Sequence, residues 1–237
     1  MDNIDRLLAV PQPTAARPLL GLTVLLIEDS RFASEAFRLM CVRSGARIRR
    51  ADSLENARKH LAVYRPSVAI VDAGLPDGSG IDLIAQLVHG SPRIDVVLGT
   101  SGDHDQRGDV MAAGADGFLA KPIDSLAAFQ SAILAHLPDD RQPPGPRLAS
   151  NDIIAPDRVA YRDDLVHVIE VLSGGEPEAV DYVTQFLGGV SASARDADIA
   201  SAVERLKSLR QDEAPLDGGI AALKTLVEAR LDAAGPI

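Results

Sequence analysis

Residues 68–80 read VAIVDAGLPDGSG, so that a continuous apolar run ends at Asp72 and enters a turn rich in glycine. A short apolar run without polar alternation is typical of a strand that is buried on both faces of a parallel sheet. The same pattern precedes Glu28 and Asp29, where residues 22–27 read LTVLLI. Two buried strands that both end in carboxylates indicate a parallel sheet with a polar site at one edge.

Strand-like and helix-like patterns alternate five times between residues 21 and 138. The expected strands are 22–27, 47–50, 68–71, 94–98 and 117–120. The expected helices are 30–42, 53–64, 81–88, 106–113 and 125–137. This alternation predicts a parallel sheet with helices on both faces, joined by right-handed crossovers. We therefore predict an α/β fold: a flavodoxin-like, doubly wound, five-stranded parallel sheet.

The rest of the chain divides into an N-terminal extension (1–20), a proline-rich linker (139–150) and a C-terminal region (151–237). The linker reads DDRQPPGPRLAS, a composition typical of a stiff connection between domains. The C-terminal region shows helical periodicity alone, and we expect a small all-helical region that binds a protein or self-associates. Its expected helices are 157–172, 177–187, 191–210 and 219–231, with Gly188 and Gly189 ending the second.

Composition narrows the classes of partner. The formal net charge is −10, and residues 151–237 hold sixteen Asp and Glu against eight Lys and Arg. Because acidic surfaces repel phosphate backbones and no basic recognition helix is evident, these counts argue against nucleic acid as a partner. No apolar run reaches the ~20 residues of a membrane span, and residues 1–10 do not resemble a signal peptide. We expect a cytoplasmic protein in which the single cysteine, Cys41, is a buried apolar residue.

Polar residues follow the buried strands at positions that share one edge of the predicted sheet. They are Glu28, Asp29, Asp72, Thr100, Ser101 and Lys121. Three crowded carboxylates repel one another, and a hard divalent cation such as Mg²⁺ relieves that repulsion. A lysine and a hydroxyl at the same edge can contact phosphoryl oxygens. The set is suited to in-line phosphoryl transfer onto an aspartate.

These residues, with the turn at 72–80 and the segment AGADGFLAKP at 113–122, resemble the receiver domain of bacterial response regulators. The resemblance implies that Asp72 is the phosphoacceptor. It implies Mg²⁺ as cofactor, with these ligands: Glu28, Asp29, Asp72 and the backbone carbonyl of Gly74. It further implies that Thr100 and Lys121 contact the phosphoryl group, that Thr100 and Phe118 act as switch residues with Ser101 as an accessory hydroxyl, and that the Lys121–Pro122 peptide is cis.

The residues and the resemblance together predict a signalling function. We expect a two-component response regulator that accepts a phosphoryl group from a sensor histidine kinase or a phosphotransfer protein and then switches its helical region. We expect a signalling phosphoprotein and not an enzyme, with self-phosphorylation and self-dephosphorylation as its only catalysis. A homodimer is a further candidate assembly. The alternative is a DNA-binding transcriptional response regulator with an unrecognised helical output domain.

Two other classes of protein are disfavoured by the residues at one or two positions. A haloacid-dehalogenase-like hydrolase needs a second aspartate two residues after the nucleophile, where this chain has Gly74. A histidine phosphotransfer domain places a basic and then a small residue after its histidine. Here His167 is followed by Val168 and Ile169.

Overall fold

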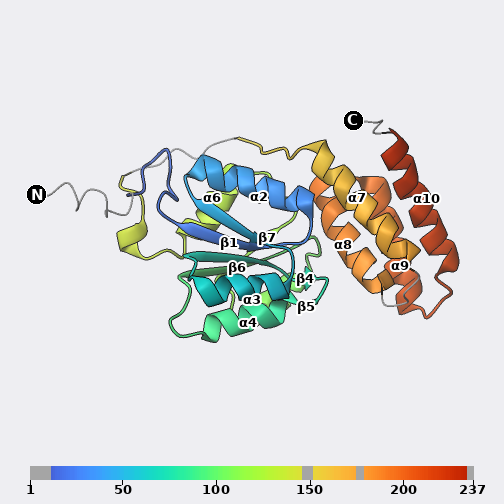
Figure 1. The fold of residues 1–237 in the computed structure, drawn as a ribbon, viewed down its shortest axis with the longest axis horizontal. Coiled ribbons are helices and arrows are strands. Elements are labelled where there is room, and N and C mark those ends of the chain that lie inside the picture. The colour runs from blue at the N-terminus through green and yellow to red at the C-terminus, as the bar shows by residue number, and fades with distance from the viewer. Residues whose placement is uncertain (1–11, 146–151, 175–178, 234–237) are drawn as a thin grey trace, which may run out of the picture.

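A five-stranded parallel sheet in the order β2-β1-β3-β6-β7 forms the centre of the N-terminal part of the chain (Figure 1). Its strands are β1 (Thr23–Ile27), β2 (Arg47–Ala51), β3 (Val68–Asp72), β6 (Val96–Ser101) and β7 (Gly117–Ala120). The computed structural model describes residues 12–145, 152–174 and 179–233. The order reverses beside β1, where a doubly wound sheet opens a crevice at its carboxyl edge. The predicted flavodoxin-like sheet is confirmed.

Helices cover both faces of this sheet. One face is packed by α2 (Arg31–Ser44) and α6 (Leu126–Leu134), and the other by α3 (Leu54–Val63), α4 (Gly80–His89) and α5 (Gln106–Ala112). Each face has its own buried apolar cluster. Fully buried side chains of the first include Leu26, Met40, Ile70, Phe129 and Ile133, and those of the second include Leu25, Ile27, Val71, Ile84 and Val97. Cys41 lies in the first cluster, where burial raises its pKa to about 12, so its predicted burial is confirmed.

Serine residues begin four of these helices. Ser30, Ser53, Ser79 and Ser125 each accept a hydrogen bond from the backbone N–H three residues ahead. An N-cap of this kind satisfies one of the N–H groups that the first turn leaves free. Ser30 comes directly after the carboxylates at the end of β1. Its cap therefore fixes the point at which the chain turns away from the sheet edge.

The glycine-rich turn after β3 is held in one shape. It contains the short hairpin of β4 (Gly74–Leu75) and β5 (Gly78–Ser79). Gly80 begins α4 so close to β3 that an added Cβ would lie 1.8 Å from the carbonyl oxygen of Asp72. No other residue fits this position without moving the chain, which explains the glycine eight residues after Asp72.

The C-terminal region is helical, as predicted. Its helices are α7 (Arg158–Ser173), α8 (Ala179–Ala194), α9 (Ala197–Gln211) and α10 (Asp217–Ala233), and a short 3-10 helix, η1 (Asp139–Arg141), precedes them. They share a separate core whose most buried members include Leu165, Val183, Leu187, Val203 and Leu223. The helices stand at one end of the sheet (Figure 1), beside the carboxyl edge. Pro177, the predicted start of the second helix, lies outside the described residues.

The predicted end of that second helix at Gly188–Gly189 is wrong. Helix α8 continues through both glycines to Ala194, and α9 begins at Ala197 instead of Ser191. Leu187 and Val190 flank the glycines and are both fully buried, so helical packing continues across them. Glycine weakens a helix but does not forbid it, and tertiary packing overrides the local preference here.

Segments outside the regular elements also pack on the sheet domain. Leu19 is fully buried in the first apolar cluster, and its N–H donates to the carbonyl of Ser44. Ile154 is buried as well, and its N–H donates to the carbonyl of Asp124 over 2.8 Å. Among helices of the described residues, none is long and apolar enough to span a bilayer.

Candidate functional site

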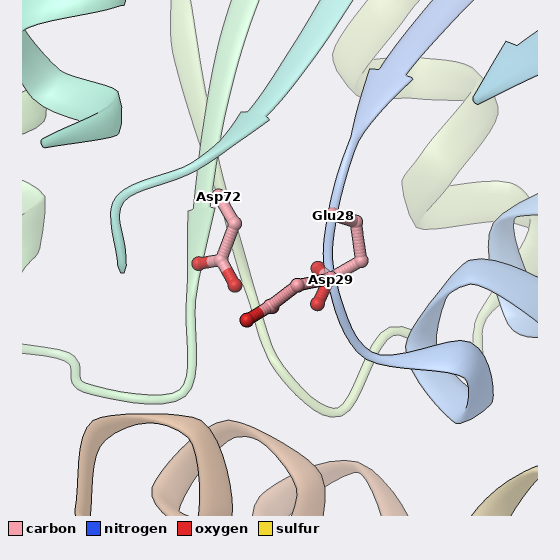
Figure 2. Close-up of side chains that lie close together, drawn as sticks. All are labelled: Glu28, Asp29 and Asp72. Atoms are coloured by element: carbon pink, nitrogen blue, oxygen red, sulfur yellow. The ribbon is translucent and has the colours of Figure 1, made fainter. Parts of the chain in front are cut away.

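Three carboxylates meet where β1 and β3 end (Figure 2). These strands are neighbours, and their register pairs Ile27 with Val71, so Glu28 and Asp29 leave β1 beside Asp72. One oxygen from each of Glu28, Asp29 and Asp72 lies within 4.8 Å of the others. The structure thus brings together the carboxylates that the sequence placed at one edge.

Lys121 completes this cluster from the end of β7. Its Nζ lies 2.8 Å from Oδ2 of Asp72 and 2.7 Å from Oε2 of Glu28, and the side chains of Lys121 and Glu28 are almost completely buried. The backbone N–H of Lys121 donates to the carbonyl of Ser101, which continues the pairing of β7 with β6. The Lys121–Pro122 peptide is cis, as the family resemblance implied.

The electrostatic balance of the cluster is unfavourable without a further cation. Burial raises the pKa of Glu28 well above its ordinary value, and the charge of Asp72 raises it further against the opposing effect of Lys121. Burial and Asp72 likewise raise the pKa of Asp29 to about 7. Burial alone would lower the pKa of Lys121, but Asp72 and Glu28 raise it above its ordinary value. One ammonium thus faces three carboxylates, and the site favours either protons or a second cation.

The donor atoms fit a magnesium ion. Mg²⁺ prefers oxygen ligands and is commonly held by one or two carboxylates with waters and phosphate oxygens. Oε2 of Glu28 is buried and contacts Lys121 as an ion pair, without a hydrogen bond of good geometry. Gly74 lies two residues after Asp72, at the start of β4. A ligand role for its carbonyl remains a prediction.

The predicted switch residues lie next to this cluster in different arrangements. Thr100 pairs with Asp72 across β3 and β6, but its hydroxyl donates to the carbonyl of Leu119 over 2.8 Å. The hydroxyl of Ser101 accepts from the N–H of Asp103. Phe118 is partly buried against the apolar cluster shared with α3 to α5. In this state both hydroxyls are engaged by backbone groups, and their contact with a phosphoryl group remains a prediction.

The C-terminal region also contributes residues to the site, and the sequence analysis missed them. Tyr182 of α8 donates its hydroxyl to Oδ2 of Asp29 over 3.0 Å. The carboxamide of Gln185 packs on Gly74, so closely that an added Cβ there would lie 1.8 Å from Nε2. Figure 2 shows helices passing beside the three carboxylates. The only sequence signal was the pair Gly188–Gly189, which we interpreted as a helix end.

Comparisons with known proteins agree with this geometry. Residues 24–133 match the family model of the response regulator receiver domain. The KDP operon transcriptional regulatory protein KdpE of Escherichia coli K12 is 32% identical over 100 residues, which are 42% of this chain and 44% of KdpE. The transcriptional regulatory protein PhoP of E. coli O157:H7 is 28% identical over 116 residues, 48% of this chain and 52% of PhoP. The chain spans about half the length of these curated relatives.

Among solved structures, HP1043, an orphan response regulator of H. pylori, is similar at 22% identity with a TM-score of 0.44; the alignment covers 54% of this chain and 100% of that one.

Because the two curated relatives are named as transcriptional regulators, the prediction against nucleic acid as a partner gains no support. The family match, the strand order and the residues at the strand ends point the same way. Residues 24–133 belong to the receiver domain family of response regulators.

Proposed function

We propose that the chain is a two-component response regulator that accepts a phosphoryl group on Asp72 from a histidine kinase or a phosphotransfer protein. The observation that carries this proposal is the contact of Asp72 with Lys121 inside a cluster of three carboxylates. A lone surface aspartate has neither a buried ammonium nor neighbouring carboxylates to hold a cation. This arrangement supplies both at the carboxyl end of a parallel strand.

The chemistry is a displacement at phosphorus. A carboxylate oxygen of Asp72 attacks the phosphorus, the bond from phosphorus to the donor imidazole nitrogen breaks, and that nitrogen keeps the electron pair. The product is an acyl phosphate on Asp72. Lys121 is positioned to pair with a phosphoryl oxygen. Mg²⁺ held by Glu28, Asp29, Asp72 and the carbonyl of Gly74 would offset the negative charge of the phosphoryl group.

Signal output requires the hydroxyls of Thr100 and Ser101 to change their hydrogen-bond partners. Thr100 would exchange its hydrogen bond with Leu119 for one with the phosphoryl group, with Ser101 as a second hydroxyl. Phe118 would follow by moving toward the space that Thr100 leaves. The proposed organisation is an extension at 1–20, a receiver at 21–138, a linker at 139–150 and a helical output region at 151–237 that binds a protein or a second copy of the chain.

A second candidate is a transcriptional regulator, which the names of KdpE and PhoP favour. Charge weighs against it, because two basic residues of α9 form ion pairs with carboxylates: Lys207 with Glu204, and Arg210 with Asp181. Mobility of promoter DNA with the full chain, measured across salt concentrations, separates the two. DNA binding with a steep salt dependence supports the transcriptional regulator, and its absence supports a protein partner.

Incubation with acetyl phosphate and Mg²⁺, followed by intact-mass measurement, tests the phosphoacceptor. The wild-type chain should gain the mass of one phosphoryl group, and Asp72→Asn should gain none. Asp82→Asn is the matched control, because Asp82 is an exposed carboxylate on α4. Equal uptake by Asp72→Asn and the wild type would contradict the proposal.

A further inference from the structure

Helix α8 presents one face to the carboxyl edge of the sheet. Tyr182, Gln185 and Gly189 lie three and four residues apart, so they share a side of the helix. Tyr182 bonds Asp29, and Gln185 covers Gly74. A Cβ added at Gly189 would lie 3.3 Å from Nζ of Lys121. Each of the three residues therefore contacts a different part of the candidate site. We call these three residues the α8 cap.

The glycines of α8 allow the two backbones to touch. A Cβ added at Gly102, in the loop after β6, would lie 2.7 Å from Cα of Gly189 and 3.0 Å from the carbonyl oxygen of Gly188. Two adjacent glycines inside a helix weaken it, so their presence calls for a reason in packing. Close approach to the loop that follows Thr100 and Ser101 supplies that reason.

Helix α7 also contacts this edge, at the start of α2. The buried carboxylate of Asp164 accepts three hydrogen bonds from the start of α2: from the hydroxyl of Ser30 at 2.7 Å, the N–H of Arg31 at 2.8 Å and the N–H of Phe32 at 3.1 Å. An anion at a helix N-terminus is stabilised by the free N–H groups and by the helix dipole. This contact begins one residue after Asp29. Helices α7 and α8 therefore both contact residues at or beside the carboxylate cluster.

The α8 cap conflicts with access to the site. Asp72 is 7% exposed with α8 in place, and Asp29, a predicted magnesium ligand, has an oxygen engaged by Tyr182. A donor protein must bring a histidine ring to Asp72, past the edge that α8 contacts at Asp29, Gly74 and Lys121. We propose that the α8 cap is a docking surface for the receiver's own phosphoacceptor edge, and that it excludes the donor protein until α8 is displaced.

This inference rests on the proposed function and adds its regulation. Because binding energies are reciprocal, a cap that hinders magnesium and the donor must itself be loosened by magnesium and a phosphoryl group. Displacement uncovers the partly buried Tyr182 and Gly188–Gly189 pair and frees the exposed Gln185 from Gly74. This face, which is partly covered in the resting state, thus becomes fully available to an output partner after phosphorylation.

A wedge at Gly189 tests the inference in the full-length chain. Gly189→Leu places a side chain against Lys121 and blocks docking, while leucine favours the helix more than glycine does. Gly218→Leu is the matched control, because Gly218 is a helical glycine of α10 with nothing within 4 Å of an added Cβ. Hydrogen exchange of the start of α2 and of the 102–105 loop reports docking, and calorimetric titration with Mg²⁺ alone reports access.

We expect Gly189→Leu to raise exchange at both segments and to bind Mg²⁺ roughly tenfold more tightly, the scale of a typical coupling between two sites. Gly218→Leu should match the wild type in both. Unchanged hydrogen exchange in Gly189→Leu, or increased hydrogen exchange without tighter Mg²⁺ binding, would contradict the proposal that the α8 cap blocks the site. The rate of phosphoryl uptake from acetyl phosphate then separates the two proposals: equal rates in wild type and Gly189→Leu contradict the cap alone, whereas no uptake by either contradicts the phosphoacceptor.

Discussion

The receiver and the helical region carry their function in different ways. In the receiver, the chemistry lies in residue types at fixed places: carboxylates and a lysine at the ends of neighbouring strands. In the helical region, the described residues carry no comparable cluster, and the informative property is position. Its contacts with Asp29 and Gly74 matter because of what they cover. A reactive site can be recognised from its residues, whereas a covering surface is recognised from its docking.

The largest expected effect concerns the buried ion cluster of the receiver. Lys121→Met leaves Glu28 and Asp72 buried without their partner, and such removals cost about 3–5 kcal/mol in the free energy of unfolding. Urea denaturation in the presence of a chelator measures this loss. The control, Lys59→Met, breaks an exposed pair with Glu55 and should cost less than about 1 kcal/mol. Similar losses for the two variants would mean that the cluster does not depend on Lys121.

The next prediction asks whether the two regions are independent. Leu187 is fully buried in the core of the helical region, and Leu187→Ala should destabilise that region by about 2–5 kcal/mol. Uptake of a phosphoryl group from acetyl phosphate should persist, because every residue proposed for the chemistry lies in the receiver. Val166→Ala, at an exposed position of α7, is the control. Loss of uptake in Leu187→Ala alone would show that the receiver needs the bundle to hold its site.

This contrast also explains what could be predicted from the sequence. Glu28, Asp29, Asp72 and Lys121 were predicted to meet because parallel strands bring their carboxyl ends to one edge. The contact of Tyr182 with Asp29 spans 153 residues of sequence and leaves no local pattern. The glycine pair of α8 was misread for the same reason, since its purpose is an approach to Gly102 that only the tertiary structure reveals.

A pH prediction follows from Asp29 in the metal-free protein. Its pKa is raised from 3.8 to about 7, so the folded state keeps a proton that the unfolded state releases near pH 4. The stabilisation is complete below pH 4 and is lost as pH rises through 7; between pH 5 and pH 8 the loss is about 2–3 kcal/mol. Urea denaturation of wild type and Asp29→Asn at pH 5 and pH 8, with a chelator, isolates this contribution. The wild type should lose stability relative to Asp29→Asn as pH rises. A gain in its relative stability would contradict the raised pKa of Asp29.

The smallest effect concerns the turn that positions Asp72. Asp77 accepts hydrogen bonds from the N–H groups of Leu54 and Glu55, which ties this turn to the start of α3. Asp77→Ala should cost about 1 kcal/mol, as the loss of a helix cap does. Thermal unfolding of this variant beside Asp82→Ala measures the difference. Equal stability of the two variants would show that the turn is held by Gly80 and the hairpin alone.

The central claim is that Asp72 carries the phosphoryl group, and its position can be mapped directly. Borohydride reduces an aspartyl phosphate to homoserine, and peptide sequencing by mass spectrometry then locates the modified residue. After treatment with acetyl phosphate and Mg²⁺, the account predicts homoserine at position 72. Homoserine at another aspartate, or none in protein that binds Mg²⁺, would contradict it.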